Sequence, residues 1–233
     1  MKLLMNAIVK LVSGLLLTAL LLFGPAGTWN YPGGWLFCGL LFVPTLILGL
    51  VLYLKAPELL KKRLNTKETE KGQMWVVALS GVLFMVSFLA AGLDFRFGWT
   101  HVPGWLVWAA AAVQLGSYGL YAEVLRENAY LSRTVEVQEG QTVIDTGLYG
   151  IVRHPMYTAT IFLCLAIGLV LGSWISFSLM LLYPVLILFR IRGEEALLEE
   201  NLPGYRDYKA KVRWRRRYSS SPSSPFRCLL CWL

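Results

Sequence analysis

The sequence predicts an all-α polytopic integral membrane protein, a helical bundle of about six apolar helices. Of the 233 residues, 56% are hydrophobic and only 15% are charged, and the mean hydropathy is +0.55. Soluble domains carry about 25% charged residues and have too little interior to bury so much apolar surface. Six apolar runs supply the predicted helices: residues 4–23, 34–54, 74–93, 103–125, 156–171 and 174–191.

The runs differ in length, and this difference predicts how they are arranged. A membrane span needs about 20 apolar residues, a length that the first four runs approach individually. The last two runs are shorter and are separated only by "LGSW" around Gly172. We therefore expect these two to form a tight helical hairpin, either tilted or not fully spanning.

Basic residues predict the orientation in the membrane. Six lie in the loop 55–73 and nine in the segment 190–217, whereas the loops on the other side hold almost none. Because cytoplasmic loops are enriched in Lys and Arg, we expect both termini on the cytoplasmic side. The membrane is then the inner membrane in a bacterium or the endoplasmic reticulum in a eukaryote.

The net charge of +8 is explained by these loops and their contact with anionic headgroups. No basic patch is interleaved with aromatics in a recognisable module, so nucleic acid is not an expected partner. The chain divides into N-terminal transmembrane helices (1–125) with a basic cytoplasmic loop (55–73), a catalytic region (126–217) and a Ser/Pro-rich tail (218–233) that we expect to be disordered.

Two polar clusters flank the predicted hairpin. Tyr149, Arg153, His154, Pro155 and Tyr157 precede its first arm, and Arg190, Arg192, Glu194 and Glu195 end its second arm. A hairpin brings its two open ends together, so we expect a polar pocket at the cytoplasmic membrane surface with apolar walls below. Such a pocket suits a charged, water-soluble cofactor that meets a lipid-like substrate, since polar groups at membrane depth are costly.

Several other chemistries find no support in the sequence. There is no P-loop, no G-x-G-x-x-G and no G-x-S-x-G motif. The chain has two histidines, predicted on opposite sides of the membrane, and four cysteines without metal-ligand spacing. We therefore expect no metal site.

Three motifs resemble a known family. The stretches "GLYGIVRHPMY" (147–157), "RIRGEEALL" (190–198) and "YRDYKAKVRWR" (205–215) are similar to those of the isoprenylcysteine carboxyl methyltransferases. The phospholipid N-methyltransferases share the pattern more loosely. The resemblance covers roughly residues 130–217.

The resemblance implies S-adenosylmethionine as the cofactor and a lipophilic methyl acceptor that arrives through the bilayer. It places Arg190 against the substrate carboxylate and Glu194 on the polar end of the cofactor, with weaker support for a contact from Thr134. The other residues that it implies for the cofactor site are Gln141, Thr142, Val143, Ile144, Tyr149, His154, Pro155, Met156 and Tyr157.

Physical arguments agree with these roles. A guanidinium can hold a carboxylate through two hydrogen bonds, and the faces of Tyr149 and Tyr157 favour a sulfonium cation. A carboxylate acceptor is ionised at neutral pH and needs no general base. An amine acceptor needs one, for which Glu195 and His154 are the candidates.

The sequence therefore predicts a methyltransferase that acts on the carboxylate of an isoprenylcysteine-like lipid. Three alternatives stay open: a phospholipid or other amine N-methyltransferase on the same scaffold, an NADPH-dependent enzyme of the sterol-reductase kind, and a non-enzymatic membrane protein. The expected partners are the bilayer and a membrane-embedded lipophilic substrate. The sequence does not indicate an oligomeric state.

Overall fold

A computed structural model describes residues 2–65, 71–128, 130–131 and 140–218 of the chain, and within them it contains helices and no strand. This confirms the predicted all-α class. The elements are α1 (Lys2–Ala26), α2 (Pro32–Lys55), α3 (Pro57–Leu64), α4 (Lys71–Phe97), α5 (Gly104–Glu127), the 3-10 turn η1 (Gly147–Gly150), α6 (Pro155–Val170), α7 (Trp174–Met180), α8 (Tyr183–Asn201) and α9 (Tyr205–Tyr218).

Four stretches of the described chain are long and apolar enough to cross a membrane: α1, α2, the Gly72–Phe97 part of α4, and Trp174–Asn201, which holds α7 and α8. The predicted count of six is not confirmed. Helix α5 is not among the four, and it buries the polar side chains of Gln114 and Ser117. Helix α6 has 16 residues, about 24 Å at 1.5 Å per residue, which is less than the roughly 30 Å of a bilayer core.

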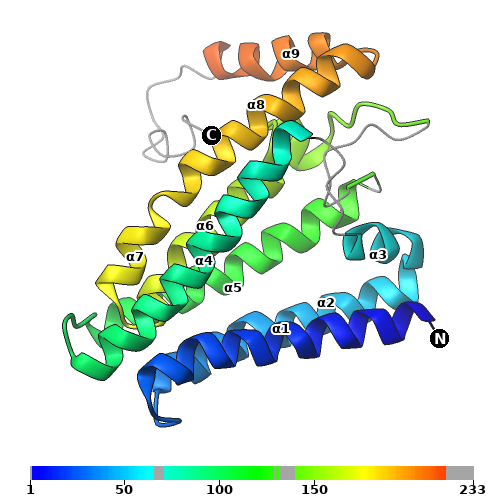
Figure 1. Ribbon diagram of the computed structural model, residues 1–233. Helices are drawn as coiled ribbons and strands as arrows, with labels where there is room; N and C mark the ends of the chain where they lie inside the picture. Colours follow the sequence, from blue (N-terminus) through cyan, green and yellow to red (C-terminus); the bar gives the residue numbers. More distant parts are fainter. Residues whose placement is uncertain (1, 66–70, 129, 132–139, 219–233) are drawn as a thin grey trace.

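The connections between the helices gather at two opposite ends of the bundle (Figure 1). At one end, which we call the turn end, residues 27–31, 98–103 and 171–173 meet. There the Tyr31 hydroxyl donates to the Leu171 carbonyl at 2.7 Å, and the Trp174 indole donates to the His101 carbonyl at 3.0 Å.

At the other end, which we call the polar end, lie α3, η1 and α9 (Figure 1). The helices that connect the two ends therefore alternate in direction, as a bundle with short connections requires. Which end faces the cytoplasm stays a prediction.

The predicted tight hairpin is present between α6 and α7. Gly172 turns the chain with φ +79°, a conformation that residues with a Cβ rarely adopt. Gly168 permits the close packing of the two arms, since a Cβ there would lie 2.2 Å from the backbone nitrogen of Phe177. Ser173 caps α7 by accepting a hydrogen bond from the Ser176 backbone N–H.

Two features of the fold were not predicted. The second arm of the hairpin is divided into α7 and α8 at Leu181–Leu182, directly before Tyr183-Pro184, because proline lacks the N–H that would continue the helix. The basic stretch 55–73 was interpreted as a loop, but it contains α3, whose Leu59 and Leu60 are buried.

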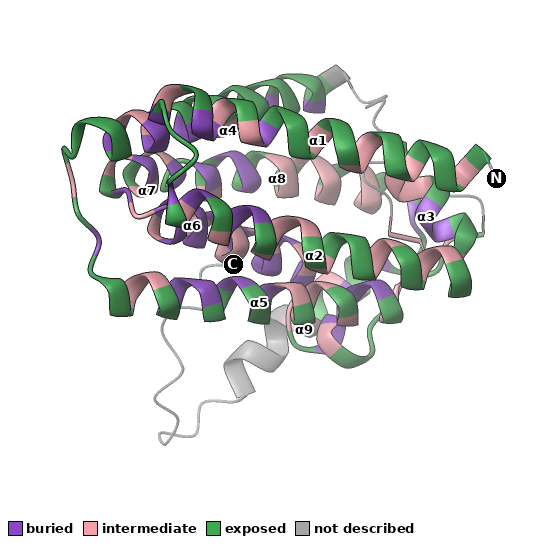
Figure 2. Ribbon diagram, turned by 90° about the horizontal axis from the view of Figure 1, so that it is seen from below, coloured by how far each residue is buried: buried purple, intermediate pink, exposed green. Residues whose placement is uncertain are grey.

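Burial agrees with a membrane setting. Buried residues lie on the sides of α4, α5, α6 and α7 that face the interior of the bundle, above all on α6, and the outer faces are exposed (Figure 2). Those exposed faces are apolar, with Leu16, Leu20 and Trp105 each at least 65% exposed. Soluble monomers rarely expose such continuous apolar surface. These faces are therefore suited to contact with lipid.

Candidate functional site

The hairpin brings the two predicted polar clusters into contact at the polar end. The Tyr157 hydroxyl, on the first turn of α6, donates to Glu194 Oε2 at 2.5 Å. Arg190, one turn before Glu194 on α8, donates from Nε to the same hydroxyl at 3.2 Å. Residues more than thirty positions apart thus form one hydrogen-bonded unit, as the hairpin prediction required.

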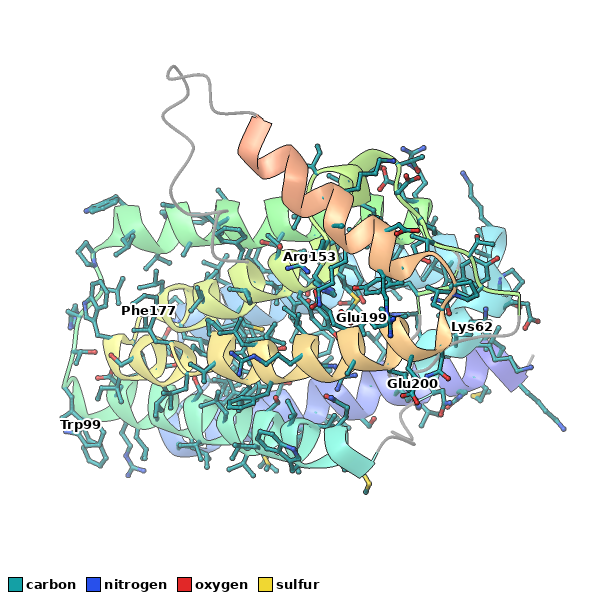
Figure 3. The ribbon with its side chains drawn as sticks, turned by 90° about the horizontal axis from the view of Figure 1, so that it is seen from above. Lys62, Trp99, Arg153, Phe177, Glu199 and Glu200 are labelled. Carbon is teal, nitrogen blue, oxygen red and sulfur yellow. The ribbon has the colours of Figure 1, made fainter. Side chains whose placement is uncertain are left out.

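Glu195 forms a second, separate cluster. Its Oε1 lies 2.8 Å from Arg153 Nη1 and 3.0 Å from His154 Nε2, and its Oε2 lies 2.7 Å from Lys209 Nζ. Arg153 lies between α9 and α8 in the view of Figure 3. With three donating partners, this carboxylate connects the segment before α6 to α8 and α9 and stays in its ionised form.

Tyr149 is fixed from two directions. Its hydroxyl accepts a hydrogen bond from Asn128 Nδ2 at 2.9 Å, and its carbonyl accepts one from the Tyr208 hydroxyl at 2.8 Å. Burial raises the pKa of Tyr149 to about 12, against the opposing effect of the Asn128 hydrogen bond. The ring is therefore a neutral phenol at physiological pH, with its position set by α5 and α9.

These residues surround a cleft at the polar end, which we call the polar cleft. Its volume is about 110 Å³. The eleven residues proposed for cofactor and substrate all line it: Gln141, Thr142, Val143, Ile144, Tyr149, His154, Pro155, Met156, Tyr157, Arg190 and Glu194. The structure thus brings the predicted site together, while the binding role of each residue stays a prediction. Thr134 lies outside the described residues.

The lining also contains residues to which the sequence assigned no role in the site: Asn128, Tyr130, Leu131, Leu197, Leu198, Leu202, Tyr205 and Tyr208. Tyr205 and Tyr208 occupy the first turn of α9, three residues apart and therefore on one helical face. Both belong to the motif 205–215 that was singled out in the sequence, and the spacing in "YRDY" was the available signal for their shared face. The apolar members could not be found, since nothing distinguishes them in sequence from leucines that face lipid.

A second cavity adjoins the cleft, and we call it the apolar cavity. It lies between α4, α5, α6 and α8, has a volume of about 490 Å³ and is walled mainly by apolar side chains. Three residues line both spaces: Met156, Tyr157 and Arg190. A polar space and an apolar space thus share one wall, which contains a guanidinium and a phenol.

The wall of the cleft contains a buried hydroxyl that a polar ligand could pair with. Tyr205 is only 4% exposed, and its hydroxyl has no hydrogen-bond partner among the described residues. Such an orphaned group is costly unless a ligand or water pairs with it. The cleft has a smaller volume than the roughly 300–1,000 Å³ of typical ligand pockets.

No metal site is found in the described chain, where no three His, Cys, Asp or Glu side chains are grouped to hold an ion. Glu194 and Glu195 are instead engaged by a hydroxyl and by basic side chains, as described above.

Comparison with known families gives a match to part of the chain. The family described as phospholipid methyltransferase matches residues 105–203, which extend from α5 through α8 and hold both halves of the polar unit. The match covers less than half of the chain. No curated protein and no solved structure matches. The similarity supports a membrane methyltransferase, a type of enzyme that generally uses S-adenosylmethionine, and does not extend to the isoprenylcysteine family.

Proposed function

We propose that the protein is an integral membrane methyltransferase that transfers a methyl group from S-adenosylmethionine to a lipophilic acceptor. The observation that carries this proposal is the wall shared by the polar cleft and the apolar cavity, formed by Met156, Tyr157 and Arg190. A soluble, charged donor and a membrane lipid can reach this wall from its two sides. The polar end would then face the cytoplasm, where the donor is available.

The chain's own residues suit the donor. S-adenosylmethionine supplies a methyl group activated on a sulfonium. Glu194 is the carboxylate for its ammonium group, and the rings of Tyr149 and Tyr157 favour a cation nearby. The Tyr205 hydroxyl gains a partner when a polar ligand enters.

As the acceptor we propose a lipid carboxylate, of the isoprenylcysteine type that the sequence motifs resemble. Arg190 lines both spaces and can hold an anion where they meet. A carboxylate is ionised at neutral pH and needs no general base. This agrees with the state of Glu195, whose three partners leave it a poor proton acceptor. Catalysis then consists of positioning the acceptor and excluding water.

A second candidate acceptor is the amine of a phospholipid, which the family match favours. An amine must lose a proton before or during transfer. His154 is the candidate for that role, because it is buried in the cleft wall and Glu195 orients its ring. Arg190 would then hold the phosphodiester instead of a carboxylate.

Titration of the purified protein with S-adenosylhomocysteine and, separately, with NADPH tests the proposal. We expect saturable binding of S-adenosylhomocysteine and none of NADPH. Binding of NADPH alone would assign the cleft to a reductase. Binding of neither ligand would favour a non-enzymatic protein.

A further inference from the structure

The Tyr205 hydroxyl is a polar group of the cleft wall that the protein itself does not satisfy. Tyr205 is 4% exposed and lines the polar cleft. Its hydroxyl oxygen is buried from water and has no hydrogen-bond partner among the described residues. Tyr208, in the same turn of α9 and 6% exposed, donates its hydroxyl to the Tyr149 carbonyl. Of these two hydroxyls, one contributes to the fold and the other makes no such contribution.

The start of α9 fixes the position of the Tyr205 ring. Helix α9 lies beside the end of α8 at the polar end (Figure 1), and the chain turns between them at Gly204, which has φ +82°. The Tyr205 backbone N–H donates to the Leu202 carbonyl at 3.2 Å. The ring packs with Leu202 and Tyr208 in a small buried cluster separate from the main core. The hydroxyl therefore has a defined place in the cleft wall.

The charges around this hydroxyl determine which ligand group it suits. Burial raises the pKa of Tyr205, and the negative charges of Glu195 and Glu194 raise it further, while Arg153 opposes them. The group is thus a neutral phenol within range of two carboxylates. Glu195 is held by three basic side chains, whereas Glu194 lines the cleft itself. A cationic N–H group that enters the cleft would meet a carboxylate and a hydroxyl oxygen, both of which accept hydrogen bonds.

We infer that Tyr205 is a specificity-determining residue whose hydroxyl accepts a hydrogen bond from the ammonium group of the methyl donor, beside Glu194. The inference rests on the proposed function and adds a residue of α9 that lies outside the matched region 105–203. An ammonium group has three N–H donors, so it can bond to a carboxylate and a hydroxyl at once. Hydrogen bonds that involve a charged group are stronger than neutral ones, so this bond favours ligands that carry the ammonium.

The inference has a consequence for stability. A buried hydroxyl without a partner lowers the stability of the free protein, because it has lost its hydrogen bonds to water. The same hydroxyl contributes to affinity once the ammonium pairs with it. Removal of the hydroxyl should therefore stabilise the free protein and weaken ligand binding, two effects of opposite sign. A hydroxyl that only supports the fold would show a loss of stability instead.

The test compares Tyr205→Phe with wild type, as the full chain in a non-ionic detergent, and uses two probes. S-adenosylhomocysteine keeps the amino-acid end of the donor, and 5′-methylthioadenosine lacks it. We expect Tyr205→Phe to weaken binding of S-adenosylhomocysteine about tenfold, as loss of a hydrogen bond to a charged group predicts. The affinity for 5′-methylthioadenosine should stay within about twofold, because that probe has no ammonium to lose. Calorimetry measures both affinities.

Thermal unfolding of the free protein gives the second readout. We expect Tyr205→Phe to unfold about 2–4 °C above wild type, as removal of an unsatisfied buried group predicts. Tyr208→Phe is the matched comparison, because it removes the paired hydroxyl of the same helical turn, and it should unfold below wild type. Tyr53→Phe, on α2 and in the lining of neither the polar cleft nor the apolar cavity, is the affinity control and should bind both probes as wild type does.

An unchanged affinity for S-adenosylhomocysteine in Tyr205→Phe would overturn the inference, as would an equal loss of affinity for both probes. A Tyr205→Phe protein that is less stable than wild type, or that fails to fold, would overturn it too, since the hydroxyl would then be paired within the protein. If 5′-methylthioadenosine binds too weakly to measure, the affinity for S-adenosylhomocysteine and the unfolding temperature decide.

The two proposals fail separately. Equal affinities of wild type and Tyr205→Phe for S-adenosylhomocysteine refute this inference only. Tyr205-dependent binding of S-adenosylhomocysteine, without transfer of a labelled methyl group to any lipid, refutes the proposed function only. Wild-type protein that does not bind S-adenosylhomocysteine refutes both.

Discussion

Two acidic side chains lie at opposite ends of the bundle, one buried and one half-buried, and they differ in what surrounds them. At the turn end, Asp94 is 1% exposed and accepts from the Thr100 backbone N–H at 2.7 Å and from the hydroxyls of Thr100 and Ser173. At the polar end, Glu194 accepts from Tyr157 and lines the polar cleft.

The difference shows that burial of a carboxylate does not by itself indicate function, since the more deeply buried Asp94 is the one without a cavity beside it. The carboxylate oxygens of Asp94 accept hydrogen bonds from residues of two connecting turns, Thr100 and Ser173. Asp94 lines neither the polar cleft nor the apolar cavity. Glu194 has a comparable hydrogen bond but also borders a space that a ligand can enter. An acidic residue within a membrane segment is by default a functional candidate, so the cavity is the observation that separates the two.

The largest expected effect is at the arginine of the polar end. Arg190→Ala removes the guanidinium that meets the acceptor's anion. Because truncating one partner of a charged pair costs several kcal/mol, we expect kcat/KM to fall about 100-fold. Affinity for S-adenosylhomocysteine should change little. Steady-state kinetics and calorimetry measure the two quantities.

Arg192→Ala is the matched control, because Arg192 is exposed two residues further along α8. Its kcat/KM should stay within twofold of wild type. Unchanged activity in Arg190→Ala would mean that the acceptor has no anion at this position.

The next effect concerns the turn end and acts on stability instead of binding. Asp94→Asn converts one carboxylate oxygen from an acceptor into a donor that faces existing donors. We expect the free energy of unfolding to fall by about 1–3 kcal/mol, the cost of an unsatisfied buried polar group. Thermal unfolding in detergent measures it. A fully stable Asp94→Asn protein that no longer binds S-adenosylhomocysteine would break the comparison, since it would give Asp94 a role in the site.

A smaller effect is expected at Glu194. Glu194→Gln keeps an acceptor for Tyr157 but removes the negative charge, so affinity for S-adenosylhomocysteine should fall about tenfold, or 1.4 kcal/mol. Calorimetry measures this affinity. Glu200→Gln, on the exposed part of the same helix, is the control and should bind as wild type does. An unchanged affinity in Glu194→Gln would remove Glu194 from the cofactor site.

The sequence predicted the features that local chemistry determines. The spacing around Gly172 indicated the hairpin, and the hairpin then placed Tyr157 beside Glu194. The polar end was predicted because both motifs sit at the ends of apolar runs. The positive φ at Gly172 and the tight approach at Gly168 are the physical reasons why that prediction held.

Features that depend on tertiary packing could not be predicted from the sequence. Arg63 Nη1 lies 3.8 Å from Met156 Sδ although the two residues are 93 positions apart, and no local pattern links them. Helix α3 forms because Leu59 and Leu60 find partners in the bundle, and its eight residues are too few to signal a helix alone. The number of spans depends on how α5 and α6 sit in the bilayer, which their composition leaves open.

The central claim is that a soluble methyl donor and a membrane lipid meet at the wall formed by Met156, Tyr157 and Arg190. The most direct measurement is mass spectrometry of lipid extracts and S-prenyl cysteine acids after incubation with the protein and methyl-labelled S-adenosylmethionine. The account predicts label in a lipid product, as a methyl ester or an N-methyl group, with little product from Arg190→Ala. Label that stays in the donor, or that reaches only water-soluble molecules, would contradict it.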